Sequence, residues 1–343
     1  MRGIPNMNGS GGPERNAKEP DRTVDMSMGG QAVIEGVMMR SPHAIATAVR
    51  LPDGTIEMKK RPYTSFVHRH RFLNIPIIRG AVSFFEMLVI GIETLNWSAD
   101  IQMQFEDEKN GTANDRGGSD GVPASGDKSG KKWNGIILWG SMAVAFVIGL
   151  AVFFALPILV ATLLGLAKGA LLFNLVAGIV RLGLFVLYIY LITRIPDIRR
   201  VFRYHGAEHK SIFALEASSE LTIESAQKES RFHPRCGTSF ILIVAIASIV
   251  LFGISDSLFP VLFGHLQSVP ERLATHLLLL PFVAGASYEL LKLSGRFRAN
   301  RLVKFLIAPG LWLQTMTTGE PDDSMLEVAL CALTAALAQE ESR

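Results

Sequence analysis

Cysteine is scarce in this sequence, since Cys236 and Cys331 are the only two among 343 residues. Two thiols are too few for the disulfide framework of a small secreted protein. Both also fall in segments that we expect in the cytoplasm, where thiols stay reduced. Neither cysteine is therefore expected to form a structural disulfide.

Several other signals are missing. Residues 1–28 are polar and have no apolar core, so they predict a disordered tail rather than a cleavable signal peptide. The glycine-rich stretches GGPERN and GTANDRGGSDG have no strand before them and no helix after them, so a nucleotide-binding loop and ATP are not expected. The net charge is only +3, which gives no basic stripe for a nucleic-acid partner.

Long apolar runs, by contrast, are abundant after residue 135. Hydrophobic residues make up 49% of the chain, and residues 136–156 carry no charge over about twenty positions, enough to cross a hydrocarbon core roughly 30 Å thick. Three further runs bring the expected number of transmembrane helices to about four, in a mainly α-helical integral membrane protein. These runs are residues 171–195, 240–263 and 274–293.

Lysine and arginine are distributed unevenly among the connections between these spans. The connection 194–239 is rich in both, whereas the other two connections carry only Lys168 and Arg272. By the positive-inside rule, the connection 194–239 and both termini face the cytoplasm. The expected location is the bacterial inner membrane, crossed several times.

A small cytoplasmic region with β-structure, residues 29–105, is expected ahead of the first span. Alternating residues flank the turn Pro52-Asp53-Gly54 and predict a β-hairpin. Residues 75–102 have an amphipathic helical pattern with a broad apolar surface, which we expect to lie against the membrane or the transmembrane helices.

The remaining segments complete the expected domain organisation. Residues 106–132 have the composition of a flexible linker. The transmembrane domain takes residues 133–320, and residues 321–343 predict a C-terminal cytoplasmic helix that begins with a capping box. Within the transmembrane domain, the short run 302–314 is broken at Pro309-Gly310, so we expect it to lie at the interface or to re-enter the membrane.

The connection 194–239 contains the stretch YHGAEHKSIFALE, in which His205, Glu208 and His209 form the pattern H-x-x-E-H. Residues four apart share one face of a helix, so both imidazoles can bind one metal ion. In the inverted zinc motif with this spacing, the glutamate is the general base that takes a proton from water. The pattern is short, and the alternative is that both histidines are interfacial side chains hydrogen-bonded to headgroups or backbone.

Four stretches follow one another along this sequence: GGQAVIEGVMMRSP, YHGAEHKSIFALE, HPRCGTSF and PGLWLQTMTTGEPDD. Together they resemble the YqhQ-like bacterial membrane proteins, a domain-of-unknown-function family labelled as predicted metal-dependent enzymes. The resemblance covers roughly residues 28–340. It implies the family, with its label of a metal-dependent enzyme, and leaves the activity open.

Three further residues are candidate ligands. His233 and Cys236 lie in the same connection, just before the third span, and imidazole and thiolate both suit zinc, the divalent metal that we expect. Glu289 lies near the cytoplasmic end of the fourth span, where a carboxylate is costly unless it is paired, solvated or bound to a cation. It could complete the metal shell, or it could form a salt bridge with Lys292 or Arg203.

Polar residues also interrupt the spans. Asn174 and Arg181 lie in the second span, and Asp256 lies near the far end of the third. We expect the first two to face the interior of the helix bundle, opposite Asp256, as structural polar contacts or as part of a path.

Two functions of different classes fit these observations. The first is a membrane-embedded metal-dependent hydrolase at the cytoplasmic face, in which Glu208 activates water beside a zinc ion held by His205 and His209. Its substrate would be a peptide, a lipid-linked molecule or another amphiphile. The second is a non-catalytic factor in assembly, translocation or transport, with a structural metal site or a hydrogen-bonded clamp. The number of protein ligands distinguishes the two functions, because a catalytic zinc ion keeps one position open for water, whereas a structural zinc ion is closed by four protein ligands.

Beyond a substrate, the contacts expected for this chain are membrane lipids and a second membrane protein. Both follow from the apolar spans and from the broad apolar surface of the amphipathic segment.

Overall fold

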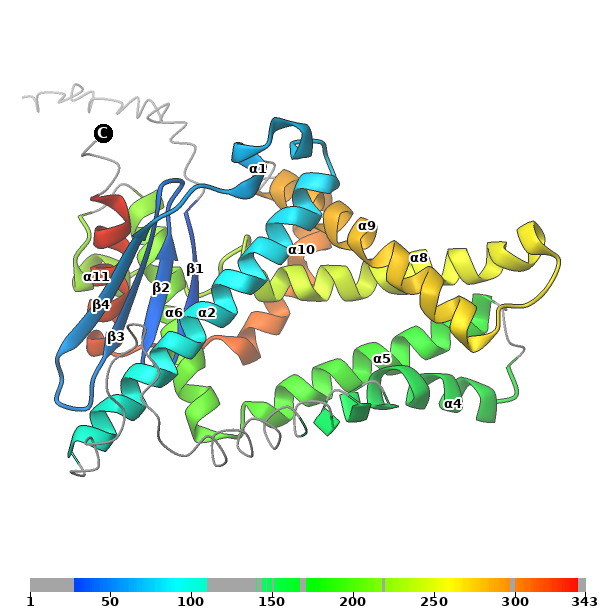
Figure 1. The fold of residues 1–343 in the computed structure, drawn as a ribbon, viewed down its shortest axis with the longest axis horizontal. Coiled ribbons are helices and arrows are strands. Elements are labelled where there is room, and N and C mark those ends of the chain that lie inside the picture. Colours follow the sequence, from blue (N-terminus) through cyan, green and yellow to red (C-terminus); the bar gives the residue numbers. More distant parts are fainter. Residues whose placement is uncertain are drawn as a thin grey trace, which may run out of the picture.

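A computed structural model of the chain describes residues 28–109, 151–166, 171–217, 220–296 and 300–338, together with isolated positions between 140 and 149. These residues are mainly helical, with one four-stranded sheet near the N-terminus (Figure 1). The strands are β1 (Gly29–Val33), β2 (Gly36–Arg40), β3 (Ala44–Arg50) and β4 (Ile56–Pro62). The helices are α1 (Phe66–Arg69), the 3-10 turn η1 (Arg71–Leu73), α2 (Ile78–Lys109), the π-helix η3 (Ala151–Ala155), α4 (Leu156–Leu163), α5 (Leu171–Ile192), α6 (Pro196–Glu216), α7 (Ile223–Gln227), α8 (Gly237–Phe263), α9 (Val269–Arg296), α10 (Arg301–Thr317) and α11 (Asp323–Leu337).

The strands form an antiparallel sheet in their order along the chain. The hairpin predicted around Pro52-Asp53-Gly54 is confirmed, since β3 and β4 pair across this turn. Asp53 Oδ1 accepts hydrogen bonds from the backbone N–H and the hydroxyl of Thr55 at 2.9 and 2.7 Å, and Gly54 adopts a positive φ of 90°. Asp53 thus accepts hydrogen bonds within the turn and Gly54 adopts a left-handed conformation, and these are the reasons that aspartate and glycine are common in turns.

Both faces of the sheet are covered by helices. Val37 and Ala48 belong to a hydrophobic cluster with residues of α6 and α11, whereas their neighbours Met38 and Val49 belong to a cluster with Ile90 of α2. Because successive side chains of a strand point to opposite faces, the sheet is the middle layer of three (Figure 1). This explains why β2 and β3 are buried along nearly their whole length.

Helix α2 confirms the helix predicted over residues 75–102. It also packs on α9, where two glycines permit a close approach: a Cβ on Gly80 would stand 2.8 Å from the carbonyl oxygen of Gly285. Large apolar side chains such as Phe85, Val89 and Ile92 remain exposed on α2. The helix runs to Lys109, into the expected linker 106–132. The rest of that linker, like the tail 1–27, lies outside the described residues.

Three helices among the described residues are long and apolar enough to cross a membrane. Their membrane-crossing segments are Leu171–Ile192, Gly237–Phe263 and Pro270–Lys292, in α5, α8 and α9. They confirm the second, third and fourth predicted spans. The first predicted span, residues 136–156, falls partly outside the described residues, and its end overlaps a shorter apolar helix at Val147–Leu163.

These long helices extend away from the sheet. In Figure 1 the connection between α8 and α9 and the beginning of α5 lie at the end of the molecule opposite the sheet. The end of α5, the beginning of α8 and helix α6 lie toward the sheet. The connection between α5 and α8 is therefore on one side of the helix bundle and the α8–α9 connection is on the other.

Helix α6 joins the transmembrane helices to the sheet. It begins at Pro196, and proline suits the first helical position because its missing N–H would have no intrahelical partner. Arg200 of α6 forms an ion pair with Glu35, which lies in the turn between β1 and β2 with a positive φ of 53°. Tyr204 donates a further hydrogen bond to the same carboxylate at 3.3 Å. These contacts fix α6 on the sheet.

A close backbone contact sets the position of α6 against the segment that follows α10. The N–H of Gly319 donates to the carbonyl of Phe202 at 2.7 Å. A Cβ on Gly206 would stand only 2.0 Å from the carbonyl oxygen of Gly319. No side chain fits there unless the backbone moves.

We therefore expect Gly206→Ala to destabilise the protein by about 1–3 kcal/mol, the usual cost of overpacking. Gly183→Ala in α5 is the matched control, because a Cβ there meets no atom within 4 Å and alanine is favoured over glycine in a helix. Thermal unfolding of the detergent-purified variants measures both effects. Equal midpoints for the two variants would contradict the close contact.

Candidate metal centre

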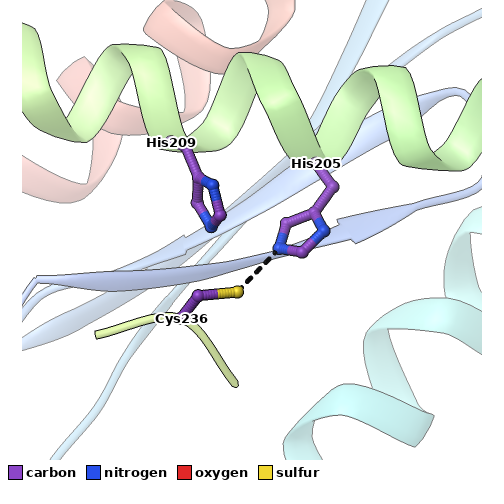
Figure 2. A group of neighbouring side chains, drawn as sticks. All are labelled: His205, His209 and Cys236. Carbon is purple, nitrogen blue, oxygen red and sulfur yellow. Dashed lines mark hydrogen bonds between the residues drawn. The ribbon is translucent and has the colours of Figure 1, made fainter. Parts of the chain in front are cut away.

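His205, His209 and Cys236 form a group whose ligand atoms all lie within 4.8 Å of one another (Figure 2). Both histidines project from the same face of α6, one turn apart, with ring centroids separated by 4.4 Å. Cys236, which is the N-cap residue of α8, lies at the same point. Two segments separated along the chain thus supply two nitrogens and one sulfur.

Backbone carbonyl groups hold the two imidazole rings. His205 Nδ1 lies 2.8 Å from the carbonyl oxygen of Thr317, and His209 Nδ1 lies 2.5 Å from that of Arg231. A carbonyl only accepts hydrogen bonds, so each Nδ1 carries the proton. The Nε2 atoms consequently face Cys236. In the described part of the chain, the buried Nε2 of His209 has no hydrogen-bond partner.

Cys236 and His205 form a charged pair. Cys236 Sγ lies 3.2 Å from His205 Nε2 and also accepts the N–H of Thr238 at the beginning of α8. Burial raises the pKa of the Cys236 thiol, but the neighbouring imidazoles, first His205 and then His209, outweigh burial and lower this pKa well below its usual range. Burial likewise opposes the imidazolium form of His205, yet the Cys236 thiolate raises the pKa of His205 to about 9. Without a metal, this pair is a thiolate and an imidazolium at neutral pH.

The carboxylate of Glu208 lies beside both imidazole rings. Its Oε2 is 3.8 Å from His205 Nε2 and 3.7 Å from His209 Nε2. On its other side lies strand β1, where a Cβ on Gly30 would stand 2.7 Å from Glu208 Cγ. Glu208 is therefore buried against the sheet, close to the ligand group and not part of it.

His233 is near this group but is held by other contacts. Its ring centroid is 5.6 Å from that of His209, and its Nε2 lies 3.4 Å from a carboxylate oxygen of Glu216. Gln314 of α10 fixes the His233 backbone, accepting its N–H at 2.8 Å and donating to its carbonyl at 2.7 Å. His233 Nδ1 accepts the N–H of Arg235. Both ring nitrogens of His233 thus have neighbours outside the ligand group.

Glu289, the fifth candidate ligand, lies in an ion pair with Arg79 of α2. Arg79 Nε donates to Glu289 Oε1 at 2.6 Å, and its Nη2 donates to Oε2 at 2.5 Å. The sequence predicts either a metal ligand or a salt bridge at Glu289, with Lys292 or Arg203 as the partner in the salt bridge. Arg203 instead pairs with Asp322. The bidentate partner of Glu289 lies 210 residues earlier in the chain.

The three-residue group suits a divalent metal ion. In a tetrahedral zinc site, nitrogen and sulfur ligands lie about 3.3–3.6 Å from one another, given metal distances near 2.0 and 2.3 Å. Small side-chain movements therefore bring the three ligand atoms to these spacings. The free Nε2 of His209 and the thiolate form of Cys236 are already the forms that bind metal.

Sequence reasoning missed three supporting groups. The carbonyls of Thr317 and Arg231 set the tautomers of the histidines, and backbone groups leave no trace in a residue pattern. Gln314, fully buried, is different. It is the polar residue that ends the apolar run 302–314, and this position next to apolar neighbours could have marked it as a buried hydrogen-bonding residue.

Comparison with known proteins agrees with the family resemblance. Residues 75–339 match a family model described as "Protein of unknown function (DUF1385)". The "Uncharacterized protein YqhQ" of Bacillus subtilis (strain 168) is 33% identical over 317 residues, which cover 90% of this chain and 91% of the relative. No solved structure matches. The match of the family model and the extent of this similarity show that the chain belongs to the DUF1385 family.

Proposed function

We propose that this protein is a membrane-embedded metal-dependent hydrolase in which His205, His209 and Cys236 hold one divalent ion, with zinc the best fit to two imidazoles and a thiolate. The observation that carries the proposal is the state of His209. Its Nδ1 is fixed by the Arg231 carbonyl, while its buried Nε2 faces the group with no hydrogen-bond partner among the described residues. A buried polar atom without a partner is costly, and a metal ion would remove that cost.

The number of ligands supports a catalytic role for the ion. Three protein ligands leave a fourth position for water or substrate, as in catalytic zinc sites, whereas structural sites are closed by four protein ligands. His233 would be the fourth ligand of a closed site, but it lies outside the group and contacts Glu216. When bound, a divalent ion supplies Lewis-acid activation of water and of the bond to be cleaved.

Glu208 is the general base in this proposal. Its carboxylate oxygen lies within 3.8 Å of both imidazole nitrogens that face the group, so it can reach a water molecule held there and take its proton. The same carboxyl group can then return the proton to the leaving group. Cys236 and the two histidines would bind the ion and fix its position, and Glu208 would transfer the proton.

The expected substrate is amphiphilic and reaches the site from the cytoplasmic face of the inner membrane. Cys236 immediately precedes the membrane-crossing segment Gly237–Phe263, so the group lies at the edge of the apolar region. A substrate with one part in the lipid and a scissile bond at the interface would bring that bond to this level. The connection 194–239 is also the one rich in lysine and arginine.

Burial favours one alternative, a structural ion without turnover. His209 is 1% exposed, and Glu208 and Cys236 are 5% exposed. An ion buried at this depth would tie α6 to the beginning of α8, and the protein would then act as an assembly or transport factor. The two functions differ in the role of Glu208 and in whether His233 binds the ion.

The first prediction from this proposal concerns substitutions in the group. His205→Ala, His209→Ala and Cys236→Ala should each abolish stoichiometric metal binding, because a three-ligand site does not tolerate the loss of one ligand. Glu208→Gln should keep the ion and lower turnover by about 10²–10⁴-fold, since an amide cannot accept the proton. Elemental analysis of the purified protein measures the metal, and a panel of chromogenic acyl and phosphodiester amphiphiles measures hydrolysis.

His233→Gln is the matched control, because it removes a nearby buried imidazole that lies outside the group. It should retain about one ion per chain, in line with three protein ligands. Loss of metal from a His233→Gln protein with an unchanged melting temperature would instead favour the closed, structural site. A wild-type protein without stoichiometric metal would contradict the hydrolase and the structural ion alike, and would favour a hydrogen-bonded clamp.

A second prediction is that metal affinity increases with pH. The pKa of His205 is raised to about 9, so below that pH the ion must displace one proton from its imidazole, whereas Cys236 has already lost its proton. The association constant should therefore rise by about tenfold per pH unit between pH 7 and pH 9 and level off above. Titration with a competing chelator at several pH values measures the slope. A flat profile over this range would show that His205 is not protonated before binding.

A third prediction tests the orientation, with Cys331→Ser as the background. His265→Cys, in the exposed α8–α9 connection, should react with an impermeant maleimide on intact cells. Glu220→Cys, exposed between α6 and α7, should react only after the cells are opened. The reverse result would put the metal centre on the outer face.

A further inference from the structure

A cavity of about 580 Å³ lies between α4, α5, α8 and α9, at the end of the bundle remote from the sheet. Asp256, one of the residues lining it, comes 20 positions after Cys236 along α8. At the helical rise this corresponds to roughly 30 Å, about the thickness of a hydrocarbon core. The cavity and the candidate metal centre are therefore at opposite ends of the membrane-crossing segment.

The walls of this cavity combine apolar side chains with ionisable ones. Phe154, Ile158 and Leu273 are among the apolar residues that line it. Asp256 is buried, forms an ion pair with Arg272 and lies 2.9 Å from His276 Nε2. Ionisable residues at membrane depth are costly and generally mark a functional site.

Arg181 brings a second positive charge to the same cavity. Its Nε donates to the carbonyl of Phe153 at 2.9 Å, and its guanidinium lies 5.1 Å from the ring centroid of Phe154. Among the described residues, no carboxylate forms an ion pair with it. Two guanidinium groups, those of Arg181 and Arg272, thus face the single carboxylate of Asp256, which leaves one positive charge uncompensated.

The adjacent sequence offers no second carboxylate, because no aspartate or glutamate occurs between Asp127 and Asp197. This interval includes α4, α5 and the whole of the connection between them. Glu271, next to Arg272, is engaged elsewhere: it contacts His265 and accepts hydrogen bonds from Ser268. The described residues near the cavity therefore do not neutralise Arg181.

Asn174 adds an unused donor to this positive site. Its Oδ1 accepts a hydrogen bond from Arg272, while its Nδ2 is buried and has no partner in the described part of the chain. Asn174 is 7% exposed and lines the cavity. An unpaired N–H group and an uncompensated guanidinium in one cavity together match an anion.

We propose that this cavity binds the singly charged headgroup of an anionic lipid, with the phosphate held by Arg181 and Asn174 and an acyl chain against the apolar walls. An added anion neutralises the excess charge and satisfies Asn174 Nδ2. The apolar walls favour a ligand with a hydrocarbon part over free phosphate, because most of the cavity lining offers no hydrogen bond. This site is independent of the metal centre.

The test uses the full-length protein in phosphatidylcholine nanodiscs. A trace of diazirine-bearing phosphatidylglycerol, or of diazirine-bearing phosphatidylcholine in a parallel sample, is photoactivated, and mass spectrometry locates the adducts. Phosphatidylglycerol should label the peptides that contain residues 151–181 and 249–276 at least about tenfold more than phosphatidylcholine, since a charge-assisted contact discriminates by this order. Equal labelling by the two lipids would overturn the proposal.

Substitutions assign the labelling to the cavity. Arg181→Gln should reduce phosphatidylglycerol labelling to the phosphatidylcholine level. Arg194→Gln is the matched control, because Arg194 is exposed just beyond the other end of α5, beside the hydroxyl of Tyr190. Its labelling should stay at the wild-type level, and a loss equal to that of Arg181→Gln would overturn the assignment.

Asn174→Asp separates charge from misfolding. The new carboxylate keeps the acceptor for Arg272 and supplies the missing negative charge, so lipid labelling should fall by at least about tenfold while the melting temperature stays equal or rises. Unchanged labelling in this variant would contradict the charge argument. Inorganic phosphate is added as a competitor in the last experiment. If millimolar phosphate abolishes labelling of the wild type, the ligand is the free anion and the lipid proposal fails.

Discussion

Two backbone carbonyl groups, those of Thr317 and Arg231, determine what the candidate metal centre can do. The last carbonyls of a helix have no intrahelical partner, and Thr317 is the last residue of α10, so its oxygen is free to accept the N–H of His205. The Arg231 carbonyl lies between α7 and α8, outside any helix, and accepts the N–H of His209.

These acceptors are useful only if α6 lies close to the end of α10. The contact between Gly206 and Gly319 makes that approach possible. Tautomer, ring orientation and metal-binding capacity therefore all depend on a packing contact between two glycines. The resulting arrangement resembles other metal sites, in which a hydrogen bond to the second ring nitrogen of a histidine orients the first toward the metal.

The local parts of this structure were predictable from the sequence, and the parts that depend on distant segments were not. The H-x-x-E-H spacing correctly predicts that His205 and His209 share a helical face, and the apolar runs predict α5, α8 and α9. The hairpin around Asp53-Gly54 follows from turn chemistry. Each of these depends on residues within one helix or one turn.

Glu289 illustrates what a local pattern leaves open. Its ion-pair partner belongs to α2, 210 residues away, and the close approach of Gly80 to Gly285 brings the two helices together. Neither neighbouring residues nor helical spacing indicates that pairing. The three-layer arrangement of α6 and α11, the sheet and α2 is likewise set by packing between segments far apart in sequence. This layered arrangement also explains why Glu208, on the helix that follows α5, lies against a β-strand.

Charge is compensated differently at the two ends of α8. At its beginning, the Cys236 thiolate faces His205 and the N-terminus of a 27-residue helix, where the macrodipole favours negative charge. Near its other end, Asp256 is balanced by Arg272, and no carboxylate in the described part of the chain forms an ion pair with Arg181. Since burial makes an unbalanced charge expensive, the second end depends on an added anion.

Confinement of Glu208 links the fold to the chemistry of the metal centre. Strand β1 approaches its side chain so closely that only glycine fits at position 30, and the two imidazoles lie on its other side. A long, flexible side chain is thereby held in a narrow range of positions before any substrate binds. Preorganisation of this kind lowers the cost of bringing a base to a reacting group. The sheet therefore restrains the carboxylate that would transfer the proton in the proposed function.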